Sequence, residues 1–244
     1  MKNLIKWEMK QTFKSKAFWG IGCTFILGTL IFSLIPIIDG GRSNNELFLS
    51  IFSNFNSLIL LIIGIYAGMR ITGDLEDRKI QAAVMAGNSR FSVVATKLFV
   101  FSLSVAIFTL LSTTINSLVL FLIKGSIGID TNFFREVIMR TICFSLVEIS
   151  FASICFFLST LVKNIGAAIT INLITLVALN SIGQSLIGKE WAAGFIKFTP
   201  VGQTFLIIAD ASTKNIINSL IASILGITLV LILSYIKFRK QELK

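Results

Sequence analysis

Six long apolar stretches constrain the fold of this 244-residue chain more than any other feature of its sequence. A helix needs about 20 such residues to cross the ~30 Å hydrocarbon core of a bilayer, and it satisfies its own backbone hydrogen bonds there. The stretches therefore predict an all-α polytopic membrane protein with six transmembrane helices. The predicted spans are residues 17–38, 47–69, 91–123, 141–162, 165–187 and 216–236.

Two of these stretches need interpretation. The region from Arg140 to Lys189 is too long for one span, so we expect Lys163 to mark a tight hairpin between two spans. The first stretch follows several lysines, as in a signal peptide. It is too long for one, however, and no small-residue cleavage site follows Pro36, so we expect a retained helix.

The positive charges orient the predicted spans. Most of the 22 Lys and Arg residues lie before the first span, in the loop at residues 70–90, or after the last span. Cytoplasmic segments carry such an excess, which predicts an N-in/C-in orientation. The formal net charge of +10 is then a topological signal, and no nucleic-acid partner is needed to explain it.

Residues 1–16 carry lysine at every fourth position: Lys2, Lys6, Lys10 and Lys14. On a helix these side chains share about a third of the circumference. One interpretation is a basic interfacial helix that lies along the lipid bilayer at its inner leaflet. The other is a simple positive-inside anchor, and the sequence leaves both open.

The loop at residues 70–90 predicts a short cytoplasmic helix. Acidic residues at 74–77 would occupy its first turn, and Gly87 would follow its last turn. Asn88 or Ser89 can then cap the third span. Such a helix is a surface that can dock another protein, and a solvated loop helix without a partner is the alternative.

The outer segment at residues 188–214 is mixed in character. Its apolar part is interrupted by Lys197 and Pro200 and is too short to span, which predicts an interfacial or re-entrant pair of short helices. Trp191 fits the aromatic belt at the outer interface.

Small or polar residues recur along one face of the fourth span. Glu148 is the only acid well inside a span, where an ionised carboxylate is costly, so it should be neutral, paired or exposed to water. The face lines a substrate path or forms a close-packed helix seam, and Asn172 is one candidate partner of Glu148. The residues of this face are Ser145, Glu148, Ala152, Cys155 and Ser159.

A pair of small residues in the second span, Gly64 and Gly68, allows two helices to approach closely. We interpret this pair as a weak candidate for a dimer contact.

Catalytic motifs are poorly represented. The chain has no histidine, which removes His-based catalysis and His-ligated metal sites, and we expect no enzyme, cofactor or metal site. The stretch from Gly183 to Lys189 nearly matches a phosphate-binding loop, but Glu190 stands where that loop needs a hydroxyl for magnesium. If ATP drives this protein, another chain binds it.

The layout resembles the permease subunits of ABC type 2 exporters, in the short bacterial form with a separate ATPase subunit. The basic start, the six spans, the long inner loop and the outer amphiphilic segment all fit. The most specific piece is Asp74-Leu-Glu-Asp-Arg-Lys-Ile-Gln-Ala-Ala-Val-Met-Ala-Gly87-Asn-Ser-Arg90, followed by Lys97, which looks like the family's coupling helix.

The resemblance implies a bacterial plasma-membrane exporter of an amphipathic peptide, antibiotic or lipid-like molecule. Two such permeases, identical or sister chains, would pair with two ATPase subunits that bind ATP and magnesium. The residues that would couple to the ATPase are Asp74, Glu76, Asp77, Arg78, Lys79, Gln81, Met85 and Arg90.

Two other classes of function stay open. One is a secondary transporter or channel that uses Glu148, and the other is a non-transporting membrane scaffold or immunity subunit.

Overall fold

The computed structural model describes residues 2–38, 58–124, 131–186, 189, 192, 194, 198–209 and 213–240, and nearly all of them are helical. No strand is present among them. The helices are α1 (Lys2–Lys14), α2 (Lys16–Ile38), a helix at Leu58–Glu76 that includes the π-helical segment η1 (Gly68–Thr72) and α4 (Gly73–Glu76), α5 (Lys79–Met85), α6 (Arg90–Lys124), α7 (Thr131–Leu161), α8 (Ile165–Leu186), α10 (Pro200–Ala209) and α11 (Thr213–Lys240).

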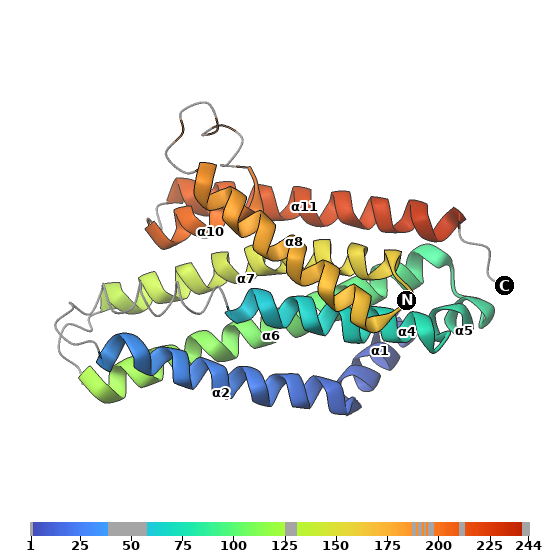
Figure 1. Cartoon of the computed structure of the whole chain (residues 1–244), viewed down its shortest axis with the longest axis horizontal. Coiled ribbons are helices and arrows are strands. Elements are labelled where there is room, and N and C mark those ends of the chain that lie inside the picture. Colours follow the sequence, from blue (N-terminus) through green and yellow to red (C-terminus); the bar gives the residue numbers. More distant parts are fainter. Residues whose placement is uncertain are drawn as a thin grey trace.

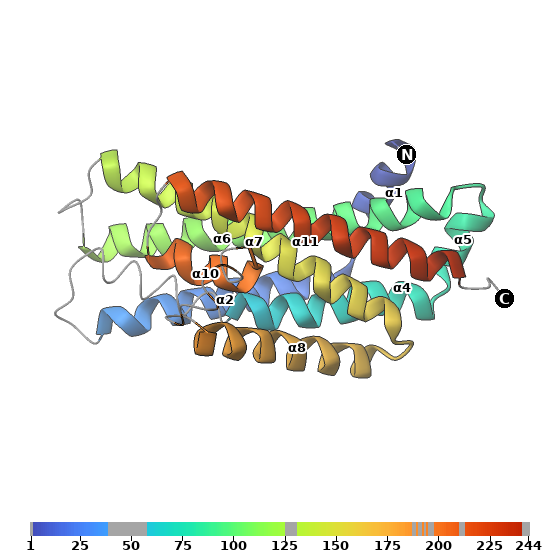
Figure 2. The same ribbon diagram turned by 90° about the horizontal axis from the view of Figure 1, so that it is seen from above.

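Six of these helices are long and apolar enough to cross a membrane, as the sequence predicted. They are α2, Leu58–Glu76, α6, α7, α8 and α11; most of them run along the long axis of the molecule, and α8 crosses obliquely in Figure 1 (Figures 1 and 2). The predicted start of the second span, at residues 47–57, lies outside the described residues. That helix ends at Glu76 rather than at Met69, and α7 begins at Thr131 rather than at residue 141.

The predicted start of the cytoplasmic helix was wrong. Asp74 and Glu76 end the second spanning helix instead of opening a new one. Arg78 then adopts a left-handed conformation with φ of 54°, which breaks the helix, and α5 begins at Lys79. Acidic residues are tolerated at the end of this helix because Asp74 is paired with cations from other helices, as described below.

The other end of α5 was predicted correctly. Gly87 has φ of +87°, a conformation that glycine adopts without steric cost. The Ser89 hydroxyl accepts a hydrogen bond from the Ser92 backbone N–H at 3.2 Å and so caps α6. The Asn88 amide donates to the Ala83 carbonyl at 2.9 Å, which holds the end of α5.

Helix α7 lies at the centre of the bundle, packed against α6, α8, α10 and α11. An aromatic cluster fills the space between α2, the second spanning helix and α6. Its rings include Phe18, Tyr66, Phe101 and Phe108, with the Phe18–Phe108 and Tyr66–Phe101 pairs stacked at 5.2 and 5.3 Å.

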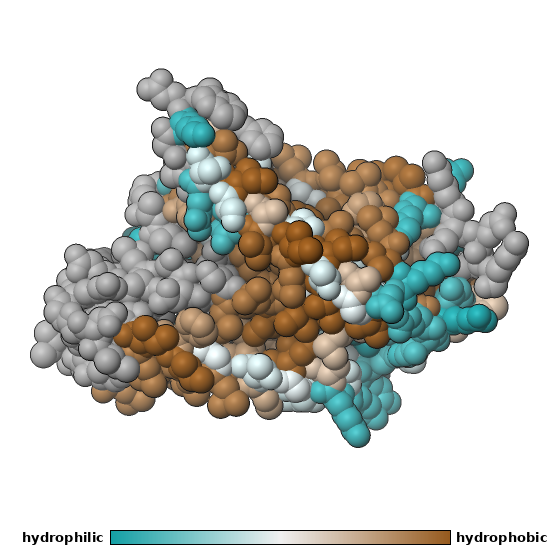
Figure 3. All heavy atoms as spheres, in the orientation of Figure 1, coloured by the Kyte–Doolittle hydropathy of each residue, from teal (hydrophilic) through white to brown (hydrophobic). Residues whose placement is uncertain are grey.

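Both ends of the described chain, in α1 and α11, lie at the same end of the bundle as α4 and α5 (Figures 1 and 2). An even number of spans requires this. Figure 3 shows apolar residues over the middle of the molecule and hydrophilic residues gathered at the end that carries α1, α4 and α5. We call this end the α5 end; the N-in/C-in orientation, which makes it cytoplasmic, stays a prediction.

At the opposite end, α10 is the short helix that the structure describes within residues 188–214. The Arg140 guanidinium, buried near the start of the fourth span, donates a 2.8 Å hydrogen bond to the carbonyl of Ile207. This bond ties α10 to α7. Most of the rest of the predicted outer segment, including Trp191, lies outside the described residues.

Candidate functional site

A network of four buried charges lies at the α5 end, and we call it the charge cluster. It consists of Glu8 from α1, Arg70 from η1, Asp74 from α4 and Lys97 from α6. The Lys97 ammonium lies 2.7 Å from Glu8 Oε1 and 2.5 Å from Asp74 Oδ2. The Arg70 guanidinium lies 3.2 Å from Glu8 Oε2 and 3.7 Å from Asp74 Oδ1. Each cation therefore bridges both carboxylates.

The side chains of these ion pairs are largely removed from water. The side chains of Glu8, Asp74 and Lys97 are each 3% exposed, and that of Arg70 is 13% exposed. Charges removed from water are tolerated when they are paired and hydrogen-bonded, whereas loss of one partner leaves a buried charge uncompensated. The charge cluster thus connects α1, the second spanning helix and α6. Removal of any one of its charges would leave an opposite charge without a full set of partners.

Lys79 lies at the edge of the charge cluster. Its ammonium is 2.6 Å from Asp77 Oδ2 and 3.4 Å from Asp74 Oδ1. The hydrogen bond to Asp77 is the largest cause that raises the pKa of Lys79, with smaller contributions from the charges of both aspartates, and partial burial opposes the shift. The first residue of α5 is thereby tied to the last turn of the second span.

Three of the predicted coupling residues make contacts between helices, although of these only Asp74 is buried. Asp74 is buried in the charge cluster. Glu76 accepts a 3.0 Å hydrogen bond from the Ile165 N–H and so caps α8. Arg90 donates 2.9 Å hydrogen bonds to the carbonyls of Phe238 and Arg239 at the end of α11.

The exposed part of the predicted coupling segment consists of Glu76, the turn that follows it and one face of α5. Asp77 and Arg78 are exposed, and Met85 is 78% exposed, which is unusual for a large apolar side chain. Gln81 is half-buried. Ile80, on the opposite face, is 4% exposed and packs into the hydrophobic core. Helix α5 is therefore anchored on one face and open on the other.

A groove of about 420 Å³ lies between α5 and α1. Trp7, 48% exposed, forms part of its wall, and the other side is lined by Ala82 and Ala83 of α5 and by Ala86, which follows it. Small side chains on α5 leave room here for a bulky group from a partner. The candidate docking surface predicted from the sequence lay on the loop alone and did not include α1, which lines this groove.

The predicted face of the fourth span is enclosed within the chain. Glu148, Ala152, Cys155 and Ser159 are each 0% exposed, and Ser145 is half-buried. Asn172 of α8 donates hydrogen bonds to the Ser159 hydroxyl at 2.8 Å and to the Gly64 carbonyl at 3.1 Å. At Ser159, this face is a contact between three spanning helices.

Glu148 differs from the charge cluster. Among the described residues, neither of its carboxyl oxygens has a hydrogen-bond partner, although the residue is 0% exposed. Asn172, a candidate partner, instead bonds to Ser159 and Gly64.

The two glycines proposed as a dimer contact face α8 of the same chain. A Cβ atom on Gly64 would lie 3.1 Å from Leu173, and one on Gly68 would lie 2.5 Å from the Ile169 side chain and 3.0 Å from its backbone nitrogen. The close approach that these glycines permit is therefore used within the chain.

Three members of the charge cluster, Glu8, Arg70 and Lys97, were not predicted as site residues. Glu8 did leave a signal, because it is the only acid within the lysine-rich residues 1–16. Comparison of the sequence with models of known protein families found no match, and comparison with curated proteins found none either.

Proposed function

We propose that this chain is the transmembrane subunit of an ATP-driven exporter of the ABC type 2 class, located in a bacterial plasma membrane. A separate ATPase subunit, present in two copies, would bind ATP and magnesium, and the chain would pair with itself or with a sister permease. The observation that carries this proposal is α5, a short helix with an exposed face that is fixed to the spanning helices behind it.

The attachment of α5 explains how a partner could move the membrane part. Its start is tied through Lys79 to Asp74, which binds Lys97 of α6. Its second residue, Ile80, packs into the hydrophobic core. A displacement of α5 would therefore reach the second and third spans directly instead of being absorbed by a mobile loop.

The apolar spans suit an amphipathic cargo such as a peptide, an antibiotic or a lipid-like molecule. Six helices are long and apolar enough to cross a membrane, and such a molecule would reach the protein from the bilayer. The residues that contact it would lie where two copies meet, because the fourth-span face is enclosed within one chain at Glu148, Ala152, Cys155 and Ser159.

The test is co-purification of an ATPase. A tagged chain purified from native membranes in mild detergent should retain an ATP-hydrolysing subunit, identified by mass spectrometry and by nucleotide turnover. Met85→Glu places a charge on the exposed face of α5 and should abolish that retention. Arg239→Glu, at the exposed end of α11, introduces a glutamate at the same end of the molecule and should leave it intact.

Absence of any ATPase from the parent complex in several mild detergents and in native-lipid particles would refute the exporter proposal. Equal loss with Met85→Glu and Arg239→Glu would place the contact elsewhere than on α5.

A secondary transporter is the second candidate, and Glu148 favours it. A fully buried carboxyl without a hydrogen-bond partner inside a span is a typical proton-carrying group. Glu148→Gln separates the two candidates, because a proton-coupled carrier would lose transport and an ATPase-driven exporter would keep it. A scaffold subunit would bind its partner without any ATP-dependent movement of cargo.

A further inference from the structure

A second groove, distinct from the one at α5, runs along the outside of α6. It encloses about 560 Å³, within the range of roughly 300–1,000 Å³ that is usual for small-molecule pockets. Ile5 of α1 lies at its wall, and α6, α7 and α11 supply the rest, including Phe99, Leu103, Ile149 and Leu231. Phe99 is 54% exposed, so the groove opens onto the surface that faces lipid.

The groove has the length of one lipid leaflet. Its α6 lining extends from Ala95 to Ala106, which at 1.5 Å per residue is about 16 Å. Half of a ~30 Å hydrocarbon core is about 15 Å. The lining is aliphatic and aromatic apart from the hydroxyls of Thr96 and Ser102. An acyl chain has this length and this chemistry.

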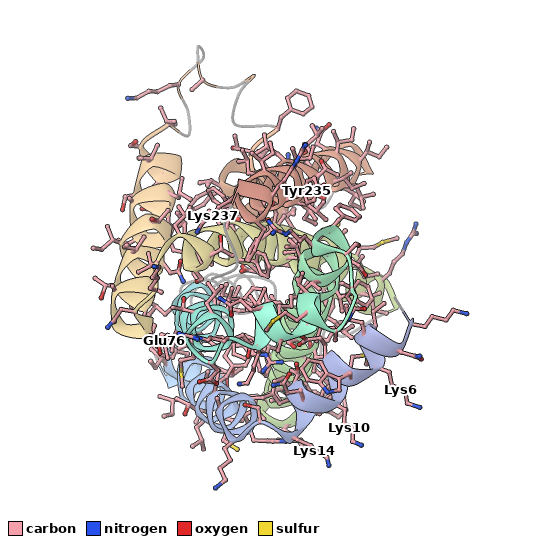
Figure 4. The ribbon with its side chains drawn as sticks, turned by 90° about the vertical axis from the view of Figure 1, so that its right-hand side faces the viewer. Lys6, Lys10, Lys14, Glu76, Tyr235 and Lys237 are labelled. Atoms are coloured by element: carbon pink, nitrogen blue, oxygen red, sulfur yellow. The ribbon has the colours of Figure 1, made fainter. Side chains whose placement is uncertain are left out.

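The end of the groove near α1 carries positive charge. Lys2 and Lys6 lie within one helical turn of Ile5, and both are exposed. Figure 4 shows Lys6, Lys10 and Lys14 pointing away from the bundle on the outer side of α1. Glu8, the only acid of α1, is turned into the charge cluster, so among the described residues of α1 the outer face presents cations and no acid.

The same end offers a hydrogen-bond donor. Thr96, which lines the groove one residue from Ala95, is 1% exposed, and its hydroxyl has no partner among the described residues. Glycerophospholipids carry ester carbonyls between the headgroup and the acyl chains, and such a carbonyl would satisfy this hydroxyl.

We propose that this groove is a binding site for one anionic phospholipid of the leaflet at the α5 end. One acyl chain lies along α6 between α1 and α11, an ester carbonyl accepts a hydrogen bond from Thr96, and Lys2 and Lys6 bind the phosphate headgroup. The site is independent of the proposed exporter function, since it requires neither an ATPase nor a cargo.

The probe is phosphatidylglycerol in phosphatidylcholine bilayers. The whole chain is reconstituted into nanodiscs with increasing fractions of phosphatidylglycerol, and native mass spectrometry counts the lipids that stay bound after release. The wild-type chain should retain about one phosphatidylglycerol in preference to phosphatidylcholine. This comparison needs no variant and so does not depend on how any substitution folds.

Paired lysine variants locate the headgroup. Lys2→Gln with Lys6→Gln should weaken retention of phosphatidylglycerol roughly thirtyfold, as expected for the loss of two cations at an anionic headgroup. Lys10→Gln with Lys14→Gln removes the same charge from the same helix, farther from Ile5, and should change retention less than about twofold.

Two substitutions fill the groove, Ala106→Phe and Ser102→Phe, each checked for folding by size-exclusion chromatography. Either should abolish retention of the lipid whatever its headgroup. Equal retention of the two phospholipids, equal weakening by the two lysine pairs, or retention in a folded, groove-filled variant would each overturn the proposal. Conversion of a dimer to a monomer by groove filling, with the lipid count unchanged, would assign the groove to a second copy of the chain.

Discussion

The charge cluster and the surroundings of Glu148 are two ways in which this protein buries acidic side chains. In the charge cluster, Glu8 and Asp74 each contact both Lys97 and Arg70, so charge balances charge. Glu148 has no ion pair and no hydrogen bond to its oxygens among the described residues. The contrast separates a site where buried charges of opposite sign are paired from a site where a buried carboxyl has no partner among the described residues.

Loss of Lys97 should have the largest effect on stability. Lys97→Met leaves Glu8 and Asp74 buried with Arg70 alone, and we expect the free energy of unfolding to fall by about 3–5 kcal/mol. Unfolding by SDS in mixed micelles measures this change. Lys163→Met, at an exposed lysine between α7 and α8, is the matched control and should change little.

A double variant sharpens the same test. Asp74→Leu combined with Lys97→Met removes one charge of each sign and keeps the Glu8–Arg70 pair. It should recover most of the stability that Lys97→Met loses, because no buried charge is then left uncompensated. If the double variant is less stable than Lys97→Met alone, packing and not charge balance accounts for the effect.

An intermediate effect is expected at the end of the fourth-span face. Ser159→Ala removes the hydroxyl that accepts the 2.8 Å hydrogen bond from Asn172, while the bond to the Gly64 carbonyl stays. Interhelical hydrogen bonds in membranes contribute about 0.6 kcal/mol on average and up to ~1.7 kcal/mol. Ser185→Ala, exposed on α8, is the control. A loss above that range would indicate that the face contributes more than this one bond.

Lys79 should make a smaller contribution to the free energy of unfolding, and this contribution should depend on pH. Its side chain is 35% exposed, so the pairs with Asp77 and Asp74 are worth about 0.2–1 kcal/mol at most. Folding raises its pKa above the ordinary value of 10.5, so the contribution is complete below pH 10.5 and is lost as the pH rises through the folded-state pKa.

The measurement for Lys79 is the difference in unfolding midpoint between the wild type and Lys79→Met. The difference should be constant from pH 7 to 9 and should shrink toward zero in strongly alkaline buffer. A difference that persists there would come from the alkyl chain and not from the charge.

The smallest effect should come from Glu148→Gln. An uncharged carboxyl and an amide have nearly the same shape, so we expect the free energy of unfolding to change by less than about 0.5 kcal/mol. The same SDS titration serves as the readout. A loss of several kcal/mol would break the comparison, because it would mean that Glu148 is ionised and paired as in the charge cluster.

The sequence predicted those parts of the fold that depend on local pattern. Apolar length identified the six spanning helices, and Gly87 and Ser89 marked the end of α5 and the start of α6. The acidic residues misled the prediction, since Asp74 and Glu76 resemble the first turn of a helix. They close one instead, because their partners, Lys97 and the Ile165 N–H, come from helices later in the chain.

The candidate site was predicted in part for the same reason. The exposed face of α5 follows from residues that are neighbours in sequence. The charge cluster joins Glu8 to Arg70 and Lys97 across most of the first half of the chain, and no periodicity indicates such a pairing. The small residues Gly64 and Gly68 did indicate a close helix contact, but the choice between a second copy and α8 depends on tertiary packing.

The order of the charge cluster along the chain bears on how the protein is made. Glu8, Arg70, Asp74 and Lys97 all precede the middle of α6, so a ribosome has synthesised every member before it reaches α7. The early helices can therefore neutralise one another in the translocon without waiting for the later ones. The contacts of Arg90 form later, because the carbonyls that it binds, at Phe238 and Arg239, are synthesised 148 and 149 residues after it. The charge cluster can thus form early in synthesis, whereas the contact between the start of α6 and the end of α11 forms only after α11 has been made.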